Sequence, residues 1–215
     1  MKLLLRLLIC LSVLSYAWGH AAWGSPAEPA GPIMIFGDSL SAGYGLRSGE
    51  GWVALLSQRL SSAGYGQPVV NASVSGETTT GGLNRLAHLL STHRPAVVVL
   101  ELGANDALRG LPPQGIEDNL VTLTRSAQKT GARVLIVGTP LPANYGVEYG
   151  QAVARAYVHA AQRTGAPLVP SLFHGIEAKE ENFQADRLHP VAGVQGRMLE
   201  NVWSSLRPLL TKNTH

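Results

Sequence analysis

Serine, aspartate and histidine residues occur in this sequence at positions that suit a nucleophile activated by a base. Ser39 follows a short apolar run, residues 33–36, and the turn residues Gly37 and Asp38. Four apolar residues bounded by glycine and proline are typical of a core strand. The polar residues after Gly37 suit the first turn of a helix, whose free N–H groups stabilise negative charge. Ser39 is therefore a candidate nucleophile, although this stretch alone is equally compatible with a serine that only caps a helix.

A serine nucleophile needs a base that a third group holds in place. Of the seven histidines, His189 alone has an aspartate three residues before it, Asp186. One turn of chain can place that carboxylate against the ring nitrogen that faces away from the nucleophile, where it fixes the tautomer and stabilises the imidazolium. Asp-X-X-His also occurs by chance in many chains. The pair becomes a candidate only in combination with Ser39.

Two further polar clusters follow apolar runs that we expect to be strands. Ser75-Gly76-Glu77 comes after the run 68–71, and Gly103-Ala104-Asn105-Asp106 comes after the run 96–102. Parallel strands share one carboxyl edge, so these clusters can converge with Ser39. Gly-X-Asn-Asp is by itself equally compatible with a simple turn. Because aspartate so often caps and turns chain, the four carboxylates beside these clusters are interpreted as structural or solvated groups: Asp38, Glu77, Glu101 and Asp106.

Apolar runs alternate with helical patterns along the whole chain. Strands are expected at 33–36, 68–71, 96–102, 133–138 and 167–170. Helices are expected at about 52–60, 78–90, 112–127, 147–164 and 192–206. This alternation predicts right-handed βαβ units and an α/β fold with one parallel sheet between two helical layers. The order of the strands is not readable from the sequence.

The first 24 residues differ from the rest of the chain. Two basic residues flank the apolar run 7–17, which is shorter than the ~20 residues of a membrane span. The pattern is typical of a secretory signal, with small residues that allow cleavage after Gly24 or after Gly19. An uncleaved anchor is the alternative. We expect residues 25–215 to be one domain, periplasmic or secreted.

Composition limits the function classes. The chain has 215 residues, 45% of them hydrophobic, which suffices for one sizeable core. Loss of Lys2 and Arg6 with the signal lowers the net charge from +3 to +1, and the other basic residues are scattered, so nucleic acid is not an expected partner. Cys10 is the only cysteine and lies in the signal, so the mature chain is expected to carry neither disulfide nor lipid.

In this order, the blocks resemble the GDSL or SGNH hydrolase family over essentially the whole mature chain. Gly-Asp-Ser-Leu-Ser at 37–41 is similar to the family's first block, Gly76 to its second, 103–106 to its third, and Asp186 with His189 to its fifth. Further stretches resemble the periplasmic subgroup of acyl thioesterases, arylesterases and lysophospholipases: 70–73, 101–103, 108–110 and 141–146. The resemblance implies a flavodoxin-like three-layer α/β/α sandwich.

The resemblance also implies roles for five residues. Ser39 would be the nucleophile, His189 the general base and then acid, and Asp186 its orienting partner. The backbone N–H groups of Ser39 and Gly76 and the side-chain amide of Asn105 would form the oxyanion hole. The implied reaction is hydrolysis of carboxylic esters or thioesters through an acyl-enzyme, without metal or cofactor. Small acyl esters, thioesters and lysophospholipids are the implied substrates, and we expect a monomer without stable membrane insertion.

The substrate pocket is less clearly indicated. Leu108, Leu111 and Tyr145 lie in loops that could line an acyl groove, but apolar loop residues are more often simply packed. One departure from the subgroup is plain: Arg187-Leu188 replaces the usual Gly-Ile between the aspartate and the histidine, and Val191 replaces a polar residue. We predict that Arg187 turns outward, puts positive charge at the mouth of the site and favours anionic leaving groups. The alternative is a solvated arginine without effect.

Two rival functions were considered. A phosphate or flavin binder is disfavoured because residues 37–45 contain neither Gly-X-Gly-X-X-Gly nor a Walker sequence. A non-catalytic module with this fold, binding lipids or a partner protein, would be distinguished by its failure to turn over a chromogenic ester.

Overall fold

The computed structural model describes residues 31–177 and 179–211, so the expected signal at 1–24 lies outside the described residues. Within them, five parallel strands form one sheet in the order β2-β1-β3-β4-β5. The strands are β1 (Ile33–Gly37), β2 (Val69–Asn71), β3 (Val97–Glu101), β4 (Arg133–Val137) and β5 (Leu168–Val169). The α-helices are α1 (Ser39–Ala42), α2 (Trp52–Ser62), α3 (Thr79–His93), α4 (Ala104–Leu108), α5 (Pro113–Lys129), α6 (Val147–Thr164) and α7 (Gln195–Leu206). Short 3-10 turns are η1 (Ala143–Tyr145), η2 (Glu180–Asn182), η3 (Ala192–Val194) and η4 (Arg207–Leu209).

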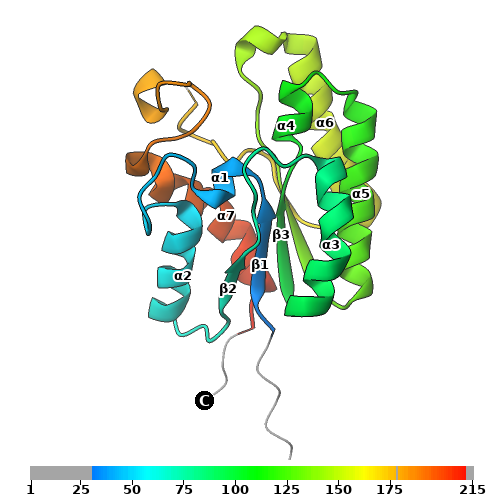
Figure 1. Ribbon diagram of the computed structural model, residues 1–215, viewed down its shortest axis with the longest axis vertical. Coiled ribbons are helices and arrows are strands. Elements are labelled where there is room, and N and C mark those ends of the chain that lie inside the picture. The colour runs from blue at the N-terminus through cyan, green and yellow to red at the C-terminus, as the bar shows by residue number, and fades with distance from the viewer. Residues whose placement is uncertain (1–30, 178, 212–215) are drawn as a thin grey trace, which may run out of the picture.

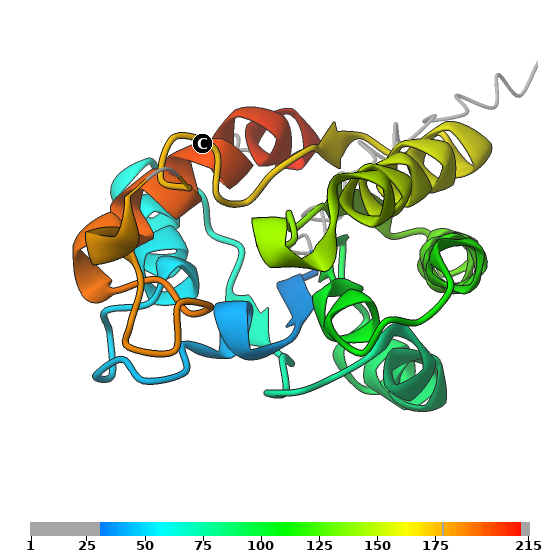
Figure 2. The same cartoon turned by 90° about the horizontal axis from the view of Figure 1, so that it is seen from above.

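Helices cover both faces of the sheet, as Figures 1 and 2 show. Helices α2 and α7 lie on one face, and α3, α5 and α6 lie on the other. Since successive side chains of a strand point to opposite faces, a strand in such a sheet must be apolar at every position. In β1, Ile33 and Ile35 pack toward α2 and α7, whereas Met34 and Phe36 pack toward α3 and α5.

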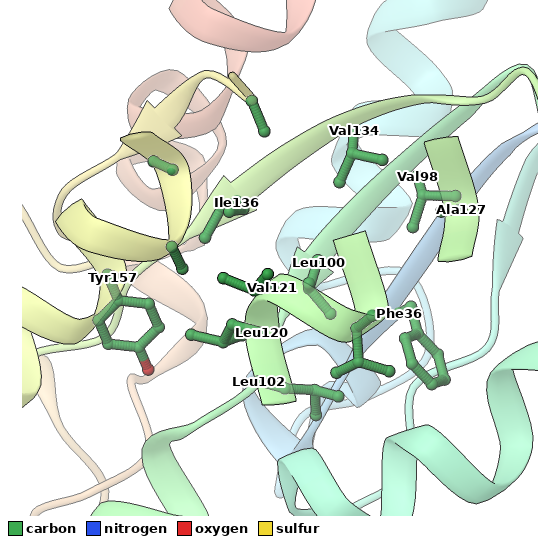
Figure 3. Close-up of a cluster of buried hydrophobic side chains, with 14 of the residues drawn as sticks. Phe36, Val98, Leu100, Leu102, Leu120, Val121, Ala127, Val134, Ile136 and Tyr157 are labelled. Atoms are coloured by element: carbon green, nitrogen blue, oxygen red, sulfur yellow. The ribbon is translucent and has the colours of Figure 1, made fainter. Parts of the chain in front are cut away.

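Figure 3 shows the hydrophobic core between the sheet and helices α3, α5 and α6. Phe36, Val98 and Leu100 rise from the strands and meet Leu120 and Val121 of α5. Tyr157 of α6 closes the cluster at one end. This core fixes β1 and β3 side by side, so the residues that follow these two strands have little freedom of position.

The strand order places a crevice beside β1. The chain leaves β1 to form β2 on one side and later returns to form β3 on the other side. In a parallel sheet the crevice at such a reversal, outside the carboxyl ends of the strands, is the usual site for ligands. Ser39 follows β1 and Asn105 follows β3, so both lie at this crevice.

The structure confirms the predicted α/β sandwich with a parallel sheet; four of the five strands lie within the expected ranges, and β1 extends one residue further, to Gly37. The last helix differs: α7 begins at Gln195 rather than at about Ala192, because residues 192–194 form the 3-10 turn η3. The side chain of Gln195 is buried and accepts a hydrogen bond from Trp52 N–H at 3.0 Å, which ties the start of α7 to the start of α2.

Candidate active site

Three side chains form a hydrogen-bonded series at the crevice. Ser39 Oγ lies 2.8 Å from His189 Nε2, and His189 Nδ1 lies 2.7 Å from Asp186 Oδ2. Because a carboxylate only accepts, the ring must carry its proton on Nδ1, which leaves Nε2 free to accept from the serine hydroxyl. The structure therefore brings together the serine, the histidine and the aspartate that the sequence singled out.

The turn after β1 presents Ser39 to the cavity. Asp38 caps α1 through its Oδ1, which accepts from Leu40 N–H at 3.0 Å, and Ser39 is the first residue of that helix. Gly37 is required here for lack of space, since a Cβ would lie 2.6 Å from the Glu101 carboxylate and 2.8 Å from Ser41 Oγ. The turn thus places Ser39 at the first position of α1, where it lines the cavity.

Asn105 and Gly76 line the same cavity as Ser39. Asn105, in the first turn of α4, donates one N–H of its side chain to Asp38 Oδ2 at 2.9 Å. Gly76 has a φ of +78°, a conformation that disfavours other residues, and a Cβ there would meet no atom of the described chain. The positive φ, rather than a lack of space, therefore favours glycine at this position.

Hydrogen bonds join the α4 region to the chain around Gly76. Asp106 is 2% exposed, and its two oxygens accept from Thr79 N–H at 2.8 Å and Thr79 Oγ–H at 2.6 Å. Arg109 donates to the Gly76 carbonyl at 3.1 Å. These contacts agree with the structural interpretation of Asp106, and they fix the two candidate oxyanion donors relative to each other.

The candidate base lies on an irregular stretch between β5 and α7. Asp186 Oδ1 accepts from the N–H groups of Leu188 and His189 at 2.9 and 3.0 Å, which closes a tight turn. Partial burial works to raise the pKa of Asp186, but these N–H groups and the His189 ring outweigh it and hold the pKa below its usual value. Asp186 is therefore ionised throughout the neutral range.

Two contacts at His189 were not found by sequence reasoning. The Tyr44 ring lies against the imidazole, with ring centroids 4.5 Å apart and an angle of 39° between their planes. Gln184 holds the loop through two hydrogen bonds. Its backbone N–H donates to the His189 carbonyl at 2.7 Å, and its side-chain amide donates to the Tyr44 carbonyl at 2.9 Å. The Gly-Tyr-Gly sequence at 43–45 was the only available signal, and it indicates a turn without saying what the tyrosine covers.

Arg187 occupies an unusual backbone conformation. Its φ of +57° lies in the left-handed region, where glycine is preferred, and this explains why a glycine is usual there in the subgroup that the chain resembles. The side chain is 75% exposed and lies 3.6 Å from Glu180, which is 80% exposed. Arg187 thus turns outward, as predicted, but a neighbouring carboxylate offsets its charge.

A cavity of about 610 Å³ opens beside Ser39. Its walls are mainly apolar side chains from α4, from the loop after β4 and from the irregular stretch between β5 and α7: Leu108, Leu141, Pro142, Phe173, Phe183 and Leu188. Of the four residues predicted for the pocket, Leu108 and Arg187 line it. Leu111 and Tyr145 are not among its lining residues and are 41% and 36% exposed.

Across residues 31–177 and 179–211, no three His, Cys, Asp or Glu side chains are grouped so that they could hold a metal ion. None of the helices in that part of the chain combines the length and apolar character that crossing a membrane requires.

Residues 35–193 match the model of the GDSL-like Lipase/Acylhydrolase family. Esterase TesA of Pseudomonas aeruginosa is 47% identical over 178 residues, which cover 83% of this chain and 89% of that protein. Thioesterase 1/protease 1/lysophospholipase L1 of Escherichia coli K12 is 37% identical over 188 residues, covering 87% and 89%. The crystal structure of TesA aligns with a TM-score of 0.82 at 46% identity, over 83% of this chain and 99% of that one.

A parallel α/β sheet that carries a hydroxyl, an imidazole and a carboxylate in series, at the crevice where the strand order reverses, defines a class of serine hydrolases. Within that class, the chain belongs to the GDSL-like lipase/acylhydrolase family and is a serine esterase.

Proposed function

We propose that Ser39 is the nucleophile, His189 the general base and acid, and Asp186 the group that orients the ring. The observation that carries this assignment is the pair of short contacts, 2.8 Å from Ser39 Oγ to His189 Nε2 and 2.7 Å from His189 Nδ1 to Asp186 Oδ2. His189 takes the hydroxyl proton as Oγ attacks the acyl carbonyl, and then donates it to the leaving oxygen or sulfur. Water, activated by the same nitrogen, releases the acid from the acyl-enzyme.

The oxyanion that forms in each step is bound, in this proposal, by the N–H groups of Ser39 and Gly76 and by the free N–H of the Asn105 amide. All three residues line the cavity. Such donors act mainly on charge that develops in the transition state, so they accelerate the chemical step more than they tighten binding. The reaction needs no metal or cofactor.

The substrates proposed are acyl esters and thioesters with a medium-sized apolar acyl group. The apolar walls of the cavity and its volume of about 610 Å³ support this choice. The names of the relatives, which include esterase, thioesterase, lysophospholipase and arylesterase, agree with it. Lysophospholipids are included because a phosphate-bearing leaving group would lie near Arg187 at the cavity wall.

We also propose that the enzyme works as a monomer after export to the periplasm or the medium, with removal of residues 1–24. The charged, apolar and small-residue order of that segment supports export. The complete site described above is built from one chain, which supports a monomer.

The assignment of the nucleophile is tested by Ser39→Ala. The variant should lower kcat for a p-nitrophenyl ester by roughly 10⁴-fold or more and leave the melting temperature nearly unchanged, because only one oxygen is removed from an accessible turn. Ser48→Ala, an exposed serine in the loop after α1, is the matched control. A fluorophosphonate should label the wild-type enzyme at Ser39 only. Turnover by a pure Ser39→Ala preparation close to that of the control would overturn the assignment, and a wild type that binds lipid without turnover would favour a binding module.

A further inference from the structure

Two carboxyl groups lie buried beneath the candidate nucleophile. Asp38 is 1% exposed and Glu101 is fully buried. Within the described residues, neither forms an ion pair with a lysine or arginine. Burying carboxylates without a cationic partner is costly, so a pair of them next to the site calls for a physical reason.

The hydrogen bonds of Asp38 require an ionised carboxylate. Its Oδ1 accepts from Leu40 N–H at 3.0 Å, and its Oδ2 accepts from the Asn105 amide at 2.9 Å. Both oxygens therefore face N–H donors. A proton on either oxygen would point at a donor and break one of the two bonds.

The surroundings of Glu101 suit the neutral acid. Its Oε2 accepts from Ser41 Oγ–H at 2.7 Å, while its Oε1 lies 3.3 Å from Thr139 Oγ. A hydroxyl can accept as well as donate, so a proton on Oε1 has a partner. Burial, and next the charge of Asp38, raise the pKa of Glu101 well above its usual value.

Both carboxyl groups have raised pKa values. Burial raises the pKa of Asp38 to about 6, and the Leu40 N–H, His189 and Asn105 keep it from rising further. The other ionisable groups that face Asp38 are Asp106 from α4 and Tyr157 from α6, and neither brings a positive charge. The geometry favours a negative charge on Asp38, because both of its side-chain oxygens accept from N–H groups.

We propose that Asp38 is a positioning residue for the oxyanion hole: its carboxylate holds one N–H of the Asn105 amide so that the other N–H faces the cavity. A side-chain amide can present either its oxygen or its nitrogen to a neighbour, and only the nitrogen can bond a carboxylate. Asp38 therefore selects the orientation of Asn105 in which a donor, and not an acceptor, meets the oxyanion. The proposal rests on the proposed function of Asn105.

Asp38→Asn tests the proposal with a change of one atom. The new amide has one acceptor for two donors, so its own N–H₂ must oppose either Leu40 N–H or the Asn105 amide. We expect kcat to fall by about 10- to 100-fold with KM within about twofold, which is less than the 10²- to 10³-fold loss for deleting an oxyanion donor by Asn105→Ala. Asp118→Asn is the control for the substitution itself, because it makes the same swap on an exposed residue of α5 that does not line the cavity.

A double-mutant cycle separates positioning from general support. If Asp38 acts through Asn105, the Asp38→Asn, Asn105→Ala double variant should be no slower than Asn105→Ala within about threefold. Losses that multiply, or an Asp38→Asn variant as active as Asp118→Asn, would overturn the proposal while leaving the serine esterase mechanism intact. A failure of the proposed function would instead show in the Ser39→Ala test.

A spectroscopic measurement covers the case in which Asp38→Asn does not fold. The side-chain amide resonances of Asn105, assigned by their absence in Asn105→Ala, are followed in ¹⁵N-labelled His189→Asn protein, where the imidazole no longer titrates. They should shift with a midpoint above 6, because burial raises the pKa of Asp38 to about 6 in the wild type and the variant lacks the His189 ring that keeps it from rising further. Resonances that stay fixed between about pH 4.5 and 8 would show that Asp38 does not control the Asn105 amide.

Discussion

Ser39 and Asn105 reach the cavity from the ends of β1 and β3, whereas Asp186 and His189 reach it from an irregular stretch between β5 and α7. The strand-borne part rests on buried groups, among them Asp38, Glu101 and Asp106. The loop-borne part is partly exposed: the side chain of Asp186 is 37% exposed and that of His189 is 19% exposed.

The difference follows the task of each part. Donors that stabilise developing charge must be fixed before the reaction, and burial between packed strands fixes them. A base that receives and returns a proton needs a defined ring orientation and access to water, and a short hydrogen-bonded turn supplies both. Rigid packing therefore supports the electrostatic part of the site, and local hydrogen bonds support the proton-transfer part.

After the nucleophile itself, the largest effect on turnover is expected in the loop-borne part. Asp186→Asn keeps an oxygen that can accept from Leu188 N–H and His189 N–H, but its N–H₂ faces the ring and favours the tautomer with a proton on Nε2. We expect kcat to fall by roughly 10³- to 10⁴-fold with little change in melting temperature. Steady-state kinetics and thermal melts of this variant and of Glu181→Gln, an exposed acid of the same loop, measure it. A loss of stability without a loss of kcat would make Asp186 a loop contact only.

Glu101, which is buried beneath the strand-borne part, should show the opposite pattern, an effect on stability and not on turnover. Gln in place of Glu101 mimics the protonated acid, with its oxygen toward Ser41 and its N–H₂ toward Thr139. An acid whose pKa is raised by folding binds more protons in the folded state, so the wild type loses stability as pH rises above about 4.5, the ordinary value. Glu101→Gln lacks this loss.

Between pH 4 and 8 the melting temperature of Glu101→Gln should therefore rise increasingly above that of the wild type. Each kcal/mol of unfolding free energy that the wild type loses corresponds to a difference of roughly 2–4 °C. Asp186 contributes with the reverse sign: its pKa is lowered, so its stabilisation is present above about 3.8 and is lost as pH falls below that value. Parallel melting curves for Glu101→Gln and wild type across this range would mean that Glu101 is ionised.

The smallest effect is expected at Arg187. Glycine adopts its φ of +57° without strain, so Arg187→Gly should raise stability by about 0.5–1 kcal/mol, whereas Arg187→Ala should not. Both variants lose the charge. Because Glu180 offsets that charge, we expect kcat/KM for an ester with an anionic leaving group to fall only about two- to threefold relative to a neutral ester of the same acyl chain, and less at high salt. Equal losses on both esters would leave Arg187 without a role in charge selection.

The parts of the molecule that follow simple rules of sequence were predictable. The uninterrupted β-branched run of β3 and the turn residues after β1 predicted buried strands with polar ends, and Asp186 and His189 were found by their spacing. The cavity was not. Phe173 and Phe183, which line it, belong to an irregular segment whose conformation depends on contacts with distant parts of the chain.

Leu111 was predicted to line the cavity, and it shows why sequence alone did not predict the cavity wall. It is an apolar residue in the expected loop, but its carbonyl accepts from Tyr149 of α6 at 2.7 Å and its side chain is not part of the cavity wall. Glu101 shows a similar limit for a polar residue, since sequence left open whether it was solvated or structural and the fold buries it completely. Local pattern predicts which face a residue prefers, but not which distant residue will cover it.

The hydrogen bond between Ser39 and His189 joins residues 150 positions apart. All the strands of the sheet pair in parallel, so each pairing needs a crossover connection. Contacts of such long range form slowly, because the chain must lose the entropy of large loops before these contacts stabilise it. A refolding chain can therefore regain its helices well before His189 meets Ser39. Ester turnover is in this sense a kinetic marker for the completion of folding, and a chain that folds after export becomes active only when its last segment has docked.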